Sequence, residues 1–99
     1  MDVKIKTLHF SISERLEEFT TKKVSKVIAK RDDVVSADVT LKVTKPESIN
    51  NKEAEIRIAI PGTEVFAKKT ADTFEEAIDV ALEAIKKQLA KQKEKTSKN

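Results

Sequence analysis

The spacing of apolar residues changes repeatedly along this chain, and these changes constrain its fold more than any other feature. Apolar residues first alternate with polar ones, then recur at helical spacing, alternate again through three segments, and end in a second helical stretch. A period of two places side chains on alternate faces of a strand, whereas a period of about 3.6 places them along one side of a helix. The pattern therefore predicts the order β-α-β-β-β-α.

The first strand and first helix occupy the N-terminal third of the chain. Val3 and Ile5 alternate with lysines, which predicts a short strand. Ser11 and Glu14 then have capping-box spacing, in which a serine hydroxyl accepts from a free helix amide. The apolar residues that follow predict a helix of about 16 to 18 residues ending at Lys30 or Arg31.

Three strands are predicted in the middle of the chain. The first runs from Val35, whose side chain is expected on the apolar face, to Val43 in strict alternation. The second covers residues 53–60 and the third residues 65–69. Pro61-Gly62 between them predicts a tight turn, because proline fixes φ and glycine tolerates positive φ.

The second helix is predicted after two alternative capping pairs, Asp72 with Glu75 and Thr73 with Glu76. Its apolar stripe runs from Phe74 to Leu89, with acids in its first half and lysines in its second, which complements the helix dipole. Residues 93–99 contain no apolar side chain and are expected to form a basic, disordered tail. Residues 1–92 are expected to form a single domain.

These elements combine most economically in one α+β architecture. Each strand has one apolar face and each helix one apolar stripe, so a four-stranded sheet with both helices packed on one face buries all of them. The three consecutive strands on short connections are expected to form an antiparallel meander. A chain of 99 residues can support one modest core of this kind.

Composition excludes most catalytic and metal chemistry. The chain has no cysteine, one histidine (His9) and one glycine (Gly62), so it lacks a zinc ligand set, a plausible nucleophile with its base, and a glycine-rich phosphate loop. We therefore expect a non-enzyme with no cofactor, no metal and no small-molecule substrate. No apolar stretch approaches the roughly 20 residues that cross a bilayer, and no signal peptide is visible, so no membrane association and a cytoplasmic location are expected.

The distribution of charge along the chain indicates more about possible binding partners than the net charge of +3 does. On helical wheels, basic residues form one stripe beside the apolar face of each predicted helix: Arg15, Lys22, Lys26 and Lys30 on the first, and Lys87, Lys91 and Lys95 on the second. Helices packed side by side would merge the stripes into one basic face. One interpretation is that these lysines are simply solvated and aid solubility. They also lack interleaved acids, so they repel one another, and a polyanion would relieve this repulsion.

The aromatic residues limit how nucleic acid could be recognised. The chain has no tryptophan or tyrosine, and its phenylalanines mostly fit core positions: Phe10, Phe19, Phe66 and Phe74. A sheet surface that stacks bases is therefore not expected. Lysines on helices favour recognition of phosphates and shape in folded RNA over readout of base edges.

Four segments carry a resemblance to a known family: Ser13–Phe19 with Lys23 and Lys26, Val39–Lys45, Glu76–Asp79 and Lys87–Lys93. Across nearly its whole length the sequence resembles the ribosome hibernation promoting factors, also called ribosome-associated inhibitor or sigma-54 modulation proteins. The resemblance implies a β-α-β-β-β-α fold similar to double-stranded RNA-binding domains. It also implies binding to small-subunit ribosomal RNA near the decoding channel, which blocks tRNA and mRNA sites in stress or stationary phase. Another hibernation factor is a further candidate partner.

The resemblance also implies which residues contact RNA. The basic positions of the family correspond to Lys23, Lys26, Lys87 and Lys91 on the helices and to Lys42 and Lys45 on the second strand. With Lys22, Lys30 and Lys95 from the helical wheels, these residues form the predicted RNA-binding set. Ala84 stands where relatives often carry lysine, which removes one contact.

Two questions stay open at the level of sequence. The chain resembles the short type of the family, without the C-terminal domain that pairs ribosomes in long members, so ribosome dimers and idle single ribosomes are both compatible with it. The second functional hypothesis is a protein-interaction module that modulates a transcription regulator through the sheet face or the tail.

Overall fold

The elements of the structure follow the predicted order. The computed structural model describes residues 3–8, 10–45 and 49–97, with side chains described as far as Gln92. In this part of the chain the elements are β1 (Val3–Leu8), α1 (Glu14–Ile28), β2 (Ser36–Val43), β3 (Lys52–Ile60), β4 (Thr63–Ala71) and α2 (Phe74–Ser97).

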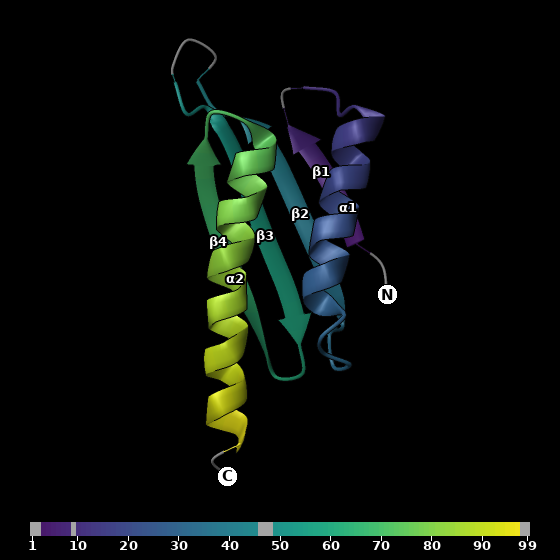
Figure 1. The fold of residues 1–99 in the computed structure, drawn as a ribbon, viewed down its shortest axis with the longest axis vertical. Coiled ribbons are helices and arrows are strands. Elements are labelled where there is room, and N and C mark those ends of the chain that lie inside the picture. Colours follow the sequence, from purple (N-terminus) through teal and green to yellow (C-terminus); the bar gives the residue numbers. More distant parts are fainter. Residues whose placement is uncertain (1–2, 9, 46–48, 98–99) are drawn as a thin grey trace.

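Within the described residues, four strands form one sheet in the order β1-β2-β3-β4. β1 pairs with β2 in parallel, because α1 carries the chain back between them, and the two later pairings are antiparallel. Figure 1 shows α1 and α2 side by side on the same face of the sheet, both running in the same direction. The predicted α+β fold is confirmed.

The core lies between the sheet and the helices. Leu41 of β2, Ile56 and Ile58 of β3, and Ile78 and Ile85 of α2 are fully buried there. Alternate strand residues point toward the helices, whereas the helical residues recur at three- and four-residue spacing, as the two apolar periods require. Burying each of these side chains contributes about 1.5–3 kcal/mol.

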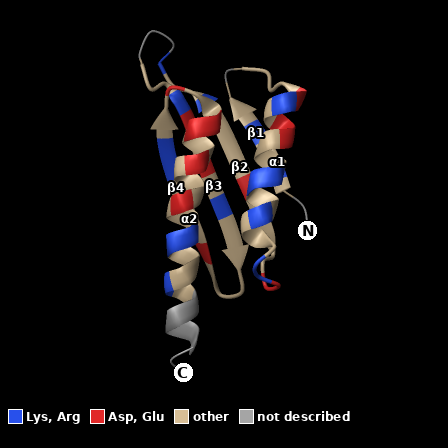
Figure 2. Ribbon diagram, viewed as in Figure 1, with Lys and Arg blue, Asp and Glu red and all other residues tan. Residues whose placement is uncertain are grey.

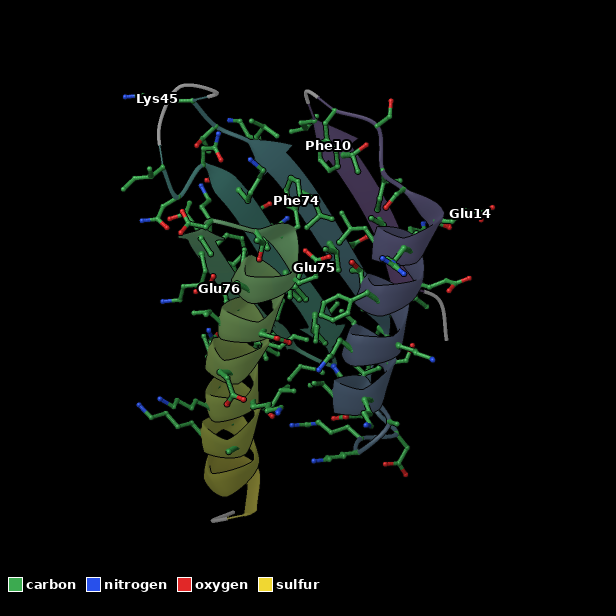
Figure 3. All side chains as sticks on the ribbon, turned by 45° about the horizontal axis from the view of Figure 1, so that its top comes forward. Phe10, Glu14, Lys45, Phe74, Glu75 and Glu76 are labelled. Atoms are coloured by element: carbon green, nitrogen blue, oxygen red, sulfur yellow. The ribbon has the colours of Figure 1, made fainter. Side chains whose placement is uncertain are left out.

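Aromatic packing closes one end of this core. The rings of Phe10, just before α1, and Phe74, the first residue of α2, stack with their centroids 4.5 Å apart. Figure 3 shows the two side chains meeting between the starts of the two helices. The stack therefore fixes the N-terminal ends of the helices relative to each other.

The helix starts confirm one capping prediction and correct the other. Ser13, not Ser11, caps α1, because its Oγ accepts a hydrogen bond of 3.1 Å from the Leu16 amide. For α2, Thr73 Oγ1 accepts from the Glu76 amide at 3.1 Å, so the second predicted capping pair holds. Asp72 binds elsewhere: its carboxylate accepts from the Asn50 amide at 2.9 Å and secures the chain before β3.

The first helix is shorter than predicted. It ends at Ile28 with Ala29 as its C-cap, so the expected end at Lys30 or Arg31 is wrong. The Arg31 amide binds the Ile28 carbonyl at 3.0 Å in a tight turn that follows the last helical residue. Lysine and arginine have good helix propensity, so the presence of Lys30 and Arg31 did not predict that the helix ends before them.

Two apolar side chains expected in the core lie outside it. Val35 is 68% exposed, because β2 begins one residue later and Val34 takes the buried place beside it. Phe66 is 37% exposed, since its neighbours Val65 and Ala67 in β4 are buried and alternation turns Phe66 to the open face.

The second helix continues beyond the predicted domain boundary. Its backbone is helical through Ser97, whereas residues 93–99 were expected to form a disordered tail. In Figure 1 this end of α2 projects past the turn between β3 and β4. The boundary at residue 92 stays a prediction.

One glutamine joins the second half of α2 to the edge of the sheet. Gln88 Nε2 donates to the Phe66 carbonyl at 2.6 Å, and its Oε1 accepts from the Phe66 amide at 3.1 Å. β4 is an edge strand, so the outer backbone groups of Phe66 have no neighbouring strand to pair with. Gln88 satisfies both groups and sets the rotation of α2 about its axis.

Gln88→Ala removes both hydrogen bonds and leaves the Phe66 backbone to water. We expect the free energy of unfolding to fall by about 1–2 kcal/mol, as for the loss of two partly exposed hydrogen bonds. Urea unfolding followed by circular dichroism measures the change, with Lys87→Ala as a control at an adjacent exposed position. A loss no larger than that of the control would contradict the assigned contact.

Candidate nucleic-acid interface

A groove runs between the two helices on the side away from the sheet. It encloses about 520 Å³ and is lined by four residues of the α1 segment and four of α2: Lys23, Lys26, Val27, Lys30, Asp79, Leu82, Glu83 and Lys86. Val27 and Leu82 are buried and form an apolar floor. All the other lining side chains are charged, so the groove is an ionic surface over a hydrophobic seam.

The α1 wall of the groove is entirely basic. Lys23, Lys26 and Lys30 follow at spacings of three and four residues, which places them on one side of the chain. Lys30 lies in the turn after α1. The Lys23 ammonium also lies 5.4 Å from the centre of the Phe19 ring. Within the described part of the chain, neither Lys26 nor Lys30 forms an ion pair.

The α2 wall carries two acids and one lysine. Lys23 Nζ of α1 lies 3.6 Å from Asp79 Oδ1, an ion pair that crosses the groove. Further along α2, Lys86 Nζ lies 3.4 Å from Glu83 Oε1 within the same helix. These pairs are exposed to solvent, and pairs of this kind are individually weak.

The groove continues toward the C-terminal ends of the helices. A second hollow of about 270 Å³ extends it and is lined by Val27, Lys30, Arg31, Lys86, Leu89 and Ala90. No acidic side chain lies among these lining residues, although Glu83 holds Lys86 and Asp33 holds Arg31.

Arg31 fastens the end of the α1 segment to α2. Its guanidinium donates to both carboxylate oxygens of Asp33, at 2.8 and 2.7 Å, and reaches the Leu89 carbonyl at 3.4 Å and Gln92 Oε1 at 3.3 Å. The hydrogen bonds with Asp33 raise the pKa of Arg31 and lower the pKa of the Asp33 carboxyl. Arg31 is thus a positioned cation rather than a mobile one.

The charge gradient follows from the parallel course of the helices. Figure 2 shows red acidic positions along the first half of α2 and, together with blue, at the start of α1, and blue basic positions further along both helices. In Figure 3, Glu14 marks the start of α1, and Glu75 and Glu76 mark the start of α2. Each helix has two acids in its first turn, Glu14 and Glu17 in α1 and Glu75 and Glu76 in α2, where the dipole favours them. Because the helices are parallel, the acidic ends lie together and so do the basic ends.

The structure brings some of the predicted RNA-binding residues together and separates others. Lys23, Lys26 and Lys30 line the groove. Lys22 points to the outer side of α1, beside Glu17 and Glu18. Lys87 and Lys91 are exposed on α2 but are not among the residues that line either part of the groove.

The remaining predicted residues lie away from the groove or outside the description. Lys42 is half-buried in β2 opposite Glu53, and Lys45 lies near the loop after β2, as Figure 3 shows. The side chain of Lys95 lies outside the described residues, and so does His9.

Sequence reasoning missed Lys86 and Arg31 as members of the basic face. An apolar helix stripe has two flanks, and periodicity does not tell which flank meets the neighbouring helix. Lys87, Lys91 and Lys95 form the more regular series, whereas the rotation fixed by Gln88 turns Lys86 toward α1. The residue that could have indicated this rotation is Gln88, which anchors α2 on the opposite flank.

The opposite face of the sheet has a balanced charge pattern. Acidic and basic residues stand across from each other on neighbouring strands: Asp38 and Arg57, Lys42 and Glu53, Glu55 and Lys68. Arg57 also lies 5.2 Å from the Phe66 ring and pairs with Glu64 at 3.5 Å. Opposite charges across β2, β3 and β4 neutralise one another, whereas Lys4 and Lys6 of β1 are exposed on the same face.

The described residues supply few other features of a functional site. Among them, no three histidine, cysteine, aspartate or glutamate side chains gather closely enough to hold a metal ion. None of the described helices combines the length and the apolar character needed to cross a membrane.

The Arg31–Asp33 pair makes stability depend on pH in a defined direction. The pKa of Asp33 is lowered in the folded protein, so its contribution is complete above the unfolded pKa of about 4 and is lost as the pH falls through the folded value. The difference in unfolding free energy between the wild type and Asp33→Asn is therefore expected to shrink below about pH 4. Urea titrations from about pH 2 to 7 measure it, with Asp32→Asn as the control. A difference that is independent of pH would contradict the pair.

Comparisons with known proteins agree with this architecture. Residues 3–97 match the model of the family described as Sigma 54 modulation protein / S30EA ribosomal protein. The chain is 30% identical over 95 residues to a ribosome hibernation promoting factor of Pseudomonas putida, covering 96% of this chain and 89% of that protein.

Two solved structures share the fold. A ribosomal subunit interface protein from Coxiella burnetii superposes with a TM-score of 0.80 at 23% identity, over 94% of this chain and 98% of the other. The N-terminal domain of Thermus thermophilus Protein Y gives 0.74 at 22% identity, over 89% and 94%. With its fold and nearly its whole length matched, this chain belongs to the Sigma 54 modulation protein / S30EA ribosomal protein family.

Proposed function

We propose that this protein binds small-subunit ribosomal RNA through the groove between its helices and inhibits translation by occupying the decoding channel. Bound there, it would block the tRNA and mRNA sites in stress or stationary phase, in the cytoplasm and without catalysis. The observation that carries the proposal is the α1 wall of the groove, where Lys26 and Lys30 line the hollow and form no ion pair within the described part of the chain.

The chemistry of the groove suits phosphate oxygens. Ammonium and guanidinium groups donate hydrogen bonds and carry positive charge, and here they stand over an apolar floor. Lys26 and Lys30 stand on the same wall of the groove and form no ion pair within the described part of the chain, so their charges repel each other until an anion binds between them. Binding RNA would also release its counterions, which supplies much of the affinity in such complexes.

The two faces of the molecule differ in charge, and this difference favours the groove as the RNA-binding site. On the open sheet face, acids and bases are matched across strands, as Asp38 with Arg57 and Glu55 with Lys68. In the groove, four lysines meet two acids, so an excess of positive charge remains. A polyanion therefore gains more from the helical side than from the sheet.

The family supports the ribosome as the partner. The Pseudomonas putida relative is named a ribosome hibernation promoting factor, and the Coxiella burnetii protein is titled a ribosomal subunit interface protein. The small subunit and its decoding channel are our extension from the family resemblance. A rigid basic groove of this size is suited to folded RNA, whose backbone presents phosphates at fixed positions.

Neutralising the groove tests the proposal. Lys26→Gln with Lys30→Gln should lower the salt dependence of small-subunit binding by about two, one for each lost phosphate contact, and weaken binding at least about tenfold at moderate salt. Co-sedimentation with isolated small subunits at several salt concentrations measures both quantities.

Two further variants locate the contact surface. Lys4→Gln with Lys6→Gln makes the same change in net charge on exposed positions of β1 and should have little effect. Lys87→Gln with Lys91→Gln tests whether contacts extend to the outer side of α2. Equal losses in the β1 and groove variants would show that only net charge matters and would refute the groove as the site. Binding that survives ribonuclease treatment of the sample would indicate a protein partner instead.

A further inference from the structure

The basic groove contains two acids that the proposed function does not use. Asp79 and Glu83 are the acidic residues among those that line the groove in the described part of the chain. They stand four residues apart on α2 and therefore on the same side of it. Both carboxylates face space where an RNA phosphate would otherwise approach, so they oppose the binding that the lysines favour.

Each acid engages a lysine of the groove. Asp79 holds Lys23 across the groove at 3.6 Å, and Glu83 holds Lys86 along the helix at 3.4 Å. Their side chains remain about half exposed or more, so the pairs are exchangeable rather than structural. A phosphate that recruits Lys23 or Lys86 must first compete with a carboxylate.

The acids divide the lysines of the groove into two groups. Lys23 is held by Asp79 and Lys86 by Glu83, whereas Lys26 and Lys30 form no ion pair within the described part of the chain. A phosphate that approaches Lys26 or Lys30 meets a positive charge that no carboxylate holds. A polyanion that lies along the whole groove also approaches the two carboxylates.

We propose that Asp79 and Glu83 are specificity-determining residues that hold Lys23 and Lys86 and direct phosphates to Lys26 and Lys30. An arbitrary polyanion, which lays charge along the whole groove, is penalised by both carboxylates. A folded RNA surface whose phosphates meet Lys26 and Lys30 without approaching the carboxylates avoids that penalty. The inference rests on the proposed function and assigns to the two acids the discrimination between ribosomal RNA and other polyanions, by a repulsive element built into the site.

The test replaces each acid by its isosteric amide. Asp79→Asn and Glu83→Gln are compared for binding to heparin and polyuridine, and to small subunits, over a range of salt concentrations. Each variant frees one lysine for a phosphate. We therefore expect heparin and polyuridine to bind about fivefold to tenfold tighter, with a salt slope steeper by about one. Small-subunit affinity should change less, so selectivity falls.

The chain offers a closely matched control. Arg57 and Glu64 form an ion pair of 3.5 Å with side chains 49% and 54% exposed, against 3.6 Å, 46% and 53% for Lys23 and Asp79, but on the opposite face of the sheet. Glu64→Gln makes the same change in net charge and should leave polyanion binding nearly unchanged.

The outcomes separate the inference from the proposed function. Tighter polyanion binding in both groove variants but not in Glu64→Gln, with a smaller gain in small-subunit affinity, supports the inference. An equal effect in Glu64→Gln, an equal gain for small subunits, or polyanion binding that is unchanged or weaker in a folded groove variant would overturn it. If one groove variant fails to fold, as judged by circular dichroism, the other decides. Failure of the wild type to bind small subunits would instead refute the proposed function, while the heparin comparison would still report on the two acids.

Discussion

The structure depends on burying two apolar helix stripes against one face of one sheet. The parallel pairing of β1 with β2 requires a crossover, and α1 supplies it on the same face that α2 covers. The helices must then lie side by side and run in the same direction. Their dipoles and charge gradients align as a result, so the lysines of their second halves gather at one end of one groove. The opposite face of the sheet is left open to solvent with matched charges.

Most of the fold could be predicted from periodicity, because the core depends on it directly. The order of elements and the common face of the helices followed from where the period changes. The exceptions occur where a neighbouring residue competes for the same place. Val34 displaced Val35 at the start of β2, and Phe66 faces outward because small Ala67 and Val65 occupy the inner face. The end of α1 was missed because a tertiary contact of Arg31, rather than a helix-breaking residue, fixes the turn there.

The site could be predicted less well, since it depends on how two helices are rotated relative to each other. The wheel of α1 placed Lys26 and Lys30 on the flank that meets α2, and family resemblance added Lys23. For α2 the regular lysine series pointed to the wrong flank for lining the groove, because Gln88 turns that helix by its bond to β4. Carboxylates within a basic groove are likewise invisible to a search for positive stripes, although they shape its potential as much as the lysines do.

The bond between Gln88 and Phe66 has a consequence for how molecules of this protein behave toward one another. An edge strand with free amides and carbonyls is a template on which another chain can add a strand, and this is a common start of aggregation. At the middle of β4 both outward groups of Phe66 are already taken by a side chain from the same molecule. An incoming strand would have to displace Gln88 and disturb the packing of α2. The residue that orients the basic helix thus also makes the middle of this edge strand harder to extend.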